Sequence, residues 1–188
     1  MKTVRNAVGR DIPVELDGRK LKPYKGLFNT FPRGRKAGGY WGRNVPGTKK
    51  LLDSIDEAIE ACKLKDGQTV SFHHHLRDGD YVVNMVMKAI AEKGLKDMIV
   101  APSALFPCHE PLVNLIDQGV IHSIEGSVNG PIGDAISHGR MKGLSILRSH
   151  GGRVRAIESG ELKIDVAFIG APTADDQEIG RASCRERV

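Results

Sequence analysis

The sequence has few cysteines, few aromatic residues and no long apolar run, and each shortage excludes a class of protein. Its three cysteines, Cys62, Cys108 and Cys184, lie far apart without a CxxC pair, which argues against a disulfide framework or a cysteine zinc site and fits a reducing compartment. Aromatic residues make up 5% of the 188 residues, which argues against a base-stacking surface for nucleic acid. No apolar run approaches the roughly 18 residues of a membrane helix, and the amino terminus has no apolar signal region. We therefore expect a cytoplasmic protein that binds neither nucleic acid nor membrane.

The residues that are present are typical of a globular protein, with 40% hydrophobic and 27% charged side chains. The net charge of +5 is not concentrated in one run. The 22 glycines indicate many tight turns or loops that approach a ligand.

The last ten residues, 179–188, differ from the rest because they show no apolar period. They can be back-translated into a common sequencing-library adapter followed by a stop codon. We therefore expect residues 178–188 to be a non-native tail on a truncated piece of a longer protein; the alternative is an ordinary flexible basic terminus. The ten residues carry three arginines and one glutamate, so the preceding residues carry +3 and two cysteines.

The remaining chain divides into an amino-terminal arm, residues 1–47, and an α/β domain, residues 48–177. Prolines and glycines punctuate the arm, which we expect to be irregular and extended. A helix beginning at Thr48 would present one apolar face formed by Leu51, Leu52, Ile55, Ala58, Ile59 and Cys62. Further patterns predict strands at 69–72, 98–101, 120–124 and 164–169, helices at 80–93, 110–118, 130–139 and 154–159, and a strand or turn at 144–147. This alternation predicts a parallel sheet with helices on both faces.

Ligands bind at the carboxyl ends of the strands in such sheets, which directs attention to the loops that follow them. The loop 73–80 leads into a helix, whose free N–H groups suit a phosphate or a developing oxyanion. In this loop Arg77 could bind a carboxylate or phosphate, and Gly79 lets a backbone approach closely. The alternative is a capped turn with solvated histidines. Consecutive residues point to opposite faces, so His73, His74 and His75 cannot easily share one ion, and we expect no metal.

Three other loops hold weaker signals. Cys108 and His109 are adjacent in sequence, which favours capping and packing over a catalytic dyad. Glu125 ends a strand and could serve as acid, base or nucleophile, although a solvated carboxylate is the simpler interpretation. Asn129 and Gly130 follow in a glycine-rich loop that is not a P-loop, because no GK[ST] follows. The stretch 149–153 suggests a small glycine-rich turn with cationic neighbours.

Several segments together resemble the alpha subunit of citrate lyase. They are Ser71-Phe72-His73-His74-His75-Leu76-Arg77-Asp78-Gly79-Asp80, Ile124-Glu125-Gly126-Ser127-Val128-Asn129-Gly130-Pro131, the stretch 148–160 beginning Arg148-Ser149-His150-Gly151-Gly152-Arg153, and Leu27-Phe28-Asn29-Thr30-Phe31-Pro32. The resemblance covers residues 1 to about 177. It implies a parallel-sheet α/β fold of the coenzyme A transferase superfamily, of which this chain would hold only the amino-terminal half.

The resemblance also implies an activity and partners. The alpha subunit exchanges the acetyl group of an acyl carrier protein for citrate, giving citryl-carrier protein and acetate. The beta subunit cleaves the citryl thioester, and the gamma subunit is the carrier, with a phosphopantetheine-type arm derived from dephospho-coenzyme A (a phosphoribosyl-dephospho-CoA arm). No cofactor bound covalently to this chain is expected. Related transferases carry a glutamate nucleophile in their second half, so none is assigned here.

The site residues follow from the loops and the resemblance together. The superfamily places a glycine-rich turn after its first core strand, and this sequence has histidines there, which makes imidazole groups the natural donors to the thioester. We expect His74, His75 and Arg77 to be catalytic and His73, Gly79, Glu125, Asn129 and Gly130 to bind substrate or thioester. The alternatives are a citramalate lyase alpha subunit, a fragment that retains only assembly contacts, and a sugar-phosphate-binding protein of similar fold.

Overall fold

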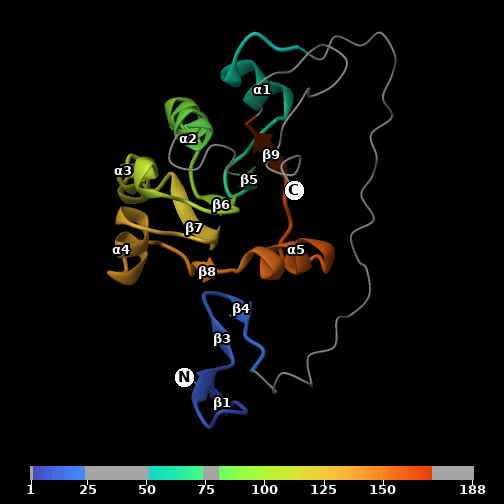
Figure 1. Ribbon diagram of the computed structural model, residues 1–188, viewed down its shortest axis with the longest axis vertical. Helices are drawn as coiled ribbons and strands as arrows, with labels where there is room; N and C mark the ends of the chain where they lie inside the picture. The colour runs from blue at the N-terminus through green and yellow to red at the C-terminus, as the bar shows by residue number, and fades with distance from the viewer. Residues whose placement is uncertain (1, 24–50, 74–80, 171–188) are drawn as a thin grey trace, which may run out of the picture.

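The computed structural model describes residues 2–23, 51–73 and 81–170, and its centre is a five-stranded parallel sheet (Figure 1). The strands are β5 (Thr69–His73), β6 (Met98–Pro102), β7 (Ile121–Gly126), β8 (Ile146–Leu147) and β9 (Val166–Ile169). Their order across the sheet is β8-β7-β6-β5-β9, and every neighbouring pair is parallel. The predicted α/β fold with a parallel sheet is confirmed.

Helices cover both faces of this sheet. The helices α2 (Val82–Glu92), α3 (Leu112–Asp117) and α4 (Pro131–Ser137) each connect one strand to the next in the direction β5 to β8, so right-handed crossovers place them on one face. Helix α1 (Ile55–Ala61) contacts α2 on that face. Helix α5 (His150–Glu158) returns from β8 to β9 at the far edge and lies on the other face (Figure 1). No helix within the described ranges is both long and apolar enough to cross a membrane.

The main hydrophobic core lies between the sheet and helices α1 to α4. It includes Val70 and Phe72 of β5, Val100 of β6 and Ile124 of β7. The helical face predicted for α2 is buried against them at Val83, Val86, Met87 and Ile90, and Gly94 ends that helix with φ +75°. A smaller cluster of Ala101, Ala156 and Leu162 packs beneath α5.

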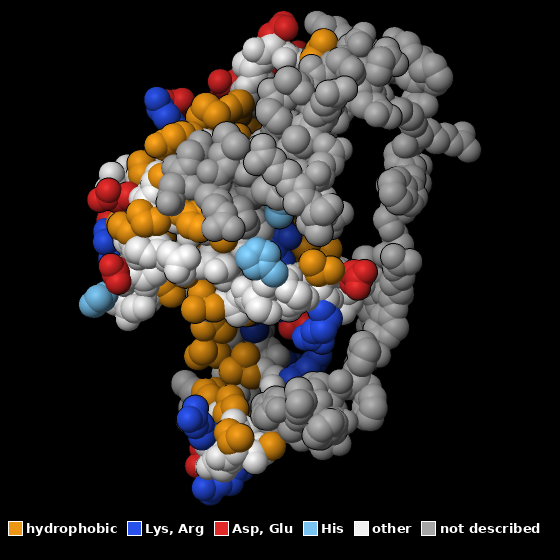
Figure 2. All heavy atoms as spheres, viewed as in Figure 1, with side chains coloured by type: hydrophobic (Ala, Val, Ile, Leu, Met, Phe, Trp, Pro, Cys, Tyr) orange, Lys and Arg blue, Asp and Glu red, His pale blue; other side chains and the backbone are white. Residues whose placement is uncertain are grey.

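The amino-terminal segment is not irregular in the residues the structure describes. It forms two antiparallel hairpins, β1 (Thr3–Arg5) with β2 (Asp11–Pro13) and β3 (Glu15–Leu16) with β4 (Arg19–Lys20). Asp17 and Gly18 both have positive φ, 48° and 68°, as a two-residue hairpin turn requires. Hydrophobic side chains follow the hairpins up to the domain (Figure 2). The rest of the predicted arm, residues 24–47, lies outside the described residues.

Two predicted helices begin elsewhere than expected, because a serine caps each one. Helix α1 starts after Ser54, whose Oγ accepts from the Glu57 N–H at 3.1 Å, while the Glu57 carboxylate accepts from the Asp53 N–H at 2.8 Å. Helix α5 starts after Ser149, whose Oγ accepts from the Gly152 N–H at 3.1 Å, so the expected turn at 149–153 is the first turn of a helix. Leu51, Leu52 and Cys62 are exposed rather than inward, because they lie outside the capped helix α1.

The last predicted strand also differs in burial. The apolar run at 164–169 predicts a fully buried strand, but β9 alternates between half-buried and exposed residues. It is the edge strand of the sheet beside β5, so only Val166 and Phe168 pack against the core, and Ile169 is exposed.

Candidate functional site

The carboxyl ends of β5, β6 and β7 lie side by side at one edge of the sheet. The Ser103 N–H after β6 donates to the Phe72 carbonyl of β5 at 2.9 Å, and the Leu105 N–H donates to the Ser127 carbonyl after β7 at 2.9 Å. His73, Glu125, Asn129 and Gly130, four of the predicted site residues, therefore lie at or next to this edge. The other four, His74, His75, Arg77 and Gly79, lie outside the described residues.

Two glycines allow the loop after β7 to run close to the loop after β6. A Cβ at Gly126 would lie 2.2 Å from the Pro102 carbonyl oxygen of β6. This distance is too short for any side chain at position 126. Gly130 adopts φ +62° and ψ −143° before α4, a region that is essentially restricted to glycine, and a Cβ there would meet Pro107 at 3.4 Å. Gly126 and Gly130 thus allow the chain after β7 to approach Pro102 and Pro107, and substrate binding by Gly130 stays a prediction.

Glu125 is buried at the end of β7 and is held by two arginines from distant parts of the chain. Its Oε1 accepts from Arg19 Nη1 at 2.6 Å, and its Oε2 accepts from Arg148 Nη2 at 2.9 Å. The Glu125 and Arg148 side chains are only 6% and 8% exposed, whereas Arg19 is 30% exposed. The carboxylate is therefore neither solvated nor directed to open space, and it joins the β3–β4 hairpin to the sheet.

A third arginine, Arg153 of α5, reaches the two central strands. Its Nη2 donates to Ser71 Oγ of β5 at 2.6 Å and to the Ala101 carbonyl of β6 at 3.2 Å. Its Nε is buried and has no hydrogen-bond partner among the described residues. Burial lowers the pKa of the Arg153 guanidinium from its usual value. Sequence reasoning noted this residue only as a cationic neighbour of a turn, and no local pattern indicates that it reaches β5.

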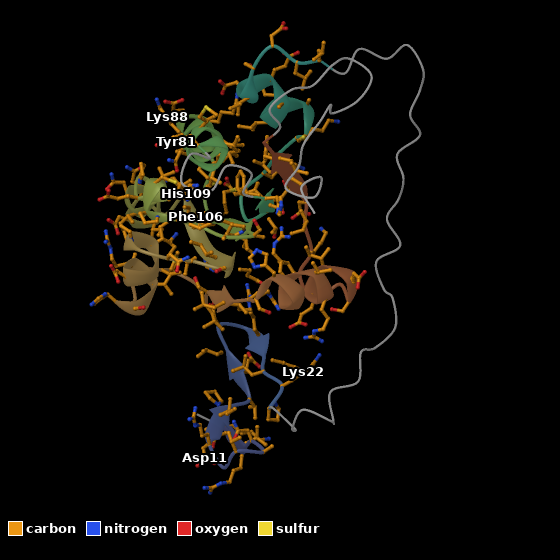
Figure 3. All side chains as sticks on the ribbon, viewed as in Figure 1. Asp11, Lys22, Tyr81, Lys88, Phe106 and His109 are labelled. Atoms are coloured by element: carbon orange, nitrogen blue, oxygen red, sulfur yellow. The ribbon has the colours of Figure 1, made fainter. Side chains whose placement is uncertain are left out.

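The Cys108–His109 pair has the capping and packing role that the sequence favours. His109 is fully buried, and its Nδ1 accepts from the Phe106 N–H at 2.9 Å, which closes the short helix η3 (Pro107–His109). The rings of Phe106 and His109 lie near each other beside α3, with centroids 6.3 Å apart (Figure 3). The Cys108 Sγ lies 3.7 Å from His109 Nδ1, which accepts the backbone proton, and 3.9 Å from His109 Nε2.

Two cavities on the described surface lie away from the strand ends. One of about 540 Å³ is lined by Gly67, Asp97, Ile99, His122 and Lys142, at the opposite, amino-terminal edge of the sheet. Another of about 480 Å³ lies between α2 and α3 and includes Tyr81 and Lys88 (Figure 3). Within residues 2–23, 51–73 and 81–170, no group of three or more His, Cys, Asp or Glu side chains is arranged to hold a metal ion. The strand ends, rather than a cavity, mark the site.

Comparison with known proteins agrees on one family. The family model described as citrate lyase, alpha subunit (CitF) matches residues 48–186. The chain is 50% identical over 128 residues to the citrate lyase alpha chain of Haemophilus influenzae, and 47% identical over 166 residues to that of Klebsiella pneumoniae. These matches cover 68% and 87% of this chain, but only 26% and 31% of the relatives. The chain thus spans about a quarter to a third of their length.

A solved structure supports the same comparison. It is described as the alpha subunit of citrate lyase in complex with citrate, from Streptococcus mutans, and it superposes with a TM-score of 0.82 at 44% identity. The match covers 93% of this chain and 34% of that one. The α/β arrangement described above is therefore shared with a protein whose structure holds citrate.

Proposed function

The chain belongs to the family of citrate lyase alpha subunits, and from this premise we propose that it contributes to the acyl exchange that such a subunit performs. In the proposed reaction, an acetyl thioester on an acyl carrier protein becomes a citryl thioester, and acetate is released. The observation that carries the proposal is the family match over residues 48–186.

The chemistry is a transfer between carboxylates through one thiol. A carboxylate oxygen of citrate attacks the acetyl thioester carbon, and the carbon–sulfur bond breaks to release the carrier thiolate. The acetyl and citryl groups are then joined through that citrate oxygen. The thiolate attacks the citrate carboxyl carbon, and acetate leaves with the oxygen that citrate supplied. Negative charge develops on a carbonyl oxygen in both steps, and preorganised N–H donors stabilise it. The proposed route forms no covalent bond to the protein, unlike that of related transferases that use a glutamate nucleophile.

The proposed site is the carboxyl edge of the sheet, at the ends of β5, β6 and β7. Imidazole and guanidinium donors in the loop after β5 would orient citrate or polarise the thioester carbonyl. The proposed catalytic residues are His74, His75 and Arg77, and the proposed substrate-binding residues are His73, Gly79, Glu125, Asn129 and Gly130.

The proposed partners are a beta subunit that cleaves citryl thioesters and a gamma subunit that carries the acyl group in the cytoplasm. The carrier's phosphopantetheine-type arm would bring the thioester to the strand ends, so this chain would need no covalently bound cofactor of its own.

The test uses a citrate lyase complex whose alpha subunit carries this sequence, with a radiolabelled acetyl group on the carrier. Citrate should release labelled acetate, and mass spectrometry should show the carrier gaining the citryl group. H74A and R77A should each lower the transfer rate at least tenfold, the scale of losing one oxyanion donor. K88A is the control, because Lys88 lies exposed on α2, and it should leave the rate unchanged.

The same assay distinguishes citrate from citramalate as the substrate. Citramalate has a methyl group where citrate has a carboxymethyl group, so faster acetate release with citramalate would assign the sister activity. Absence of transfer to either acid would contradict the proposed reaction and favour a role in assembly alone.

A further inference from the structure

A row of three side chains crosses the sheet on the face that α5 covers. Ser71 of β5 is in register with Ala101 of β6, and the pairing of Val100 with Ile124 places Ala101 beside Glu125 of β7. Neighbouring residues in these strands, such as Val70, Val100 and Ile124, belong to the core on the other face. Side chains alternate along a strand, so Ser71, Ala101 and Glu125 share the α5 face. The row lies one or two residues before the carboxyl ends, directly beneath the proposed site.

Positive charge exceeds negative charge along this row. Glu125 is bonded to two guanidinium groups, those of Arg19 and Arg148. Arg153 lies on the Ser71–Ala101 part of the row, and within the part of the chain that the structure describes it donates to a neutral hydroxyl and a neutral carbonyl. Lys and Arg side chains gather beside α5 on the side toward the hairpins (Figure 2). Glu161 Oε1 also lies 3.7 Å from Arg148 Nη1, so three cations along the row face two carboxylates.

Arg153 is the cation whose bonding is incomplete. Its Nε is buried without an acceptor, and burying a charged group without a counter-charge is costly. Ser71 and the Ala101 carbonyl fix the guanidinium on one side. An anion with planar oxygens is the ligand that a fixed guanidinium binds best.

We propose that Arg153 binds a carboxylate group of the acid that accepts the acyl carrier thioester, a polycarboxylate such as citrate. The assignment rests on the function proposed above and adds a residue to its substrate contacts. Ser71 and the Ala101 carbonyl act as positioning groups that hold the guanidinium in orientation. The charge excess on the row suits a ligand with more than one carboxylate.

A phosphate of the carrier arm offers similar oxygens, so the experiment must separate the two sources. In the complex described above, initial rates are measured while citrate and acetyl-carrier are varied in turn. R153Q should raise the KM for citrate by roughly 10- to 100-fold, the range expected for losing a hydrogen bond to a charged group. The KM for the acetyl-carrier should stay within about twofold. R153K, which keeps the charge but loses the planar fork, should fall between wild type and R153Q.

The matched control is R155Q, since Arg155 lies two residues away on α5, is exposed and pairs with Glu161; its KM for citrate should equal that of wild type. S71A tests the positioning role without removing charge, and it should raise the KM for citrate a few-fold at unchanged thermal stability. If R153Q does not fold, R153K and S71A decide the question. For each variant, the KM for citrate and the KM for the acetyl-carrier are compared with those of wild type.

The inference is overturned if the KM for citrate is unchanged in R153K and S71A, or if only the KM for the carrier rises. The latter result would assign Arg153 to a phosphate of the carrier arm. A wild-type complex that transfers nothing to citrate would instead contradict the proposed function, so the two failures are distinguishable.

Discussion

Gly126 shows how a single residue sets the distance between two strand ends. The missing Cβ would lie 2.2 Å from a backbone oxygen of Pro102, which cannot move without disturbing β6. We expect G126A to destabilise the chain by about 1–3 kcal/mol, the cost of overpacking a filled site. The control is G133A in α4, where a Cβ would make an ordinary 4.0 Å contact with Val128 and a helix gains roughly 0.5–1 kcal/mol from alanine. Urea unfolding measures both, and equal stability of the two variants would contradict the close approach.

Glu125 is a second residue whose surroundings decide how much stability is lost when it is substituted. E125A removes the carboxylate that both Arg19 and Arg148 share, and it leaves the 8% exposed Arg148 without that partner. We expect a loss of about 3–5 kcal/mol, the range for breaking a buried ion pair. R19A should cost well below this, about 1 kcal/mol or less, because Arg19 is partly solvated. If E125A and R19A lose the same stability in urea unfolding, the buried Arg148 pair is not the dominant contact.

The residues that sequence reasoning located and those that it missed differ in the range of their contacts. The inward positions of α2 follow from a local 3.6-residue period, so Val86 and Ile90 could be predicted. The bond between Arg19 and Glu125 joins residues 106 positions apart, and that between Arg153 and Ser71 joins residues 82 apart. Nothing in the local sequence encodes these pairs, because they depend on the order of the strands in the sheet.

At the scale of elements, one carboxylate connects the edge strand β9 to β5. Asp165 Oδ2 accepts from the Thr69 N–H at 2.9 Å, and its Oδ1 lies 2.7 Å from Lys163 Nζ. Lys163 first, and the Thr69 N–H second, hold the pKa of Asp165 below its ordinary value of 3.8. A lowered folded-state pKa means that this stabilisation is complete above the ordinary value and is lost as pH falls through the folded-state value.

We therefore expect D165A to lower the Tm at pH 7 and the difference from wild type to shrink toward pH 3 and below. K163A removes the main cause of the lowered pKa but keeps the Thr69 bond, so its loss of stability should begin at a higher pH than that of wild type. Thermal unfolding followed by circular dichroism from pH 7 to pH 2 provides the comparison. A constant Tm difference between D165A and wild type over this range would show that the charge of Asp165 does not stabilise the junction.

The type of each long element could be predicted from periodicity, but several starts and the short hairpins could not. Ser54 and Ser149 are ordinary capping residues, yet Thr48 is an equally good cap by composition, and only packing decides where the first helix begins. The β3–β4 hairpin carries an Asp17-Gly18 turn signal, but its strands are two residues each, too short to show an alternating pattern. Their stability comes from contact with the domain rather than from local propensity.

At the scale of the molecule, the hairpins and the sheet behave as parts of unequal stability. Neither hydrophobic cluster contains a residue before Ile55, so the core of the described domain is built without the hairpins. Polar contacts connect the β3–β4 hairpin to the domain: Arg19 with Glu125, the Leu144 N–H with Asp17 Oδ2 at 3.0 Å, and His122 with Asp17 at 3.8 Å. Such partly solvated contacts are individually weak and are screened by salt.

The hairpins should therefore be released before the sheet unfolds. In the double variant D17A/R19A, we expect amide exchange of residues 2–23 to accelerate, and protection of β5 and β6 to stay within about twofold of wild type, because local opening need not involve the core. K20A is the control, since Lys20 is an exposed residue of the same strand, and it should change neither region. Hydrogen exchange followed by mass spectrometry resolves the two regions. Equal acceleration in β5 and in the hairpins would mean that the arm and the sheet unfold as one cooperative unit, and that Glu125 and its arginines stabilise the whole domain rather than the docking of the arm alone.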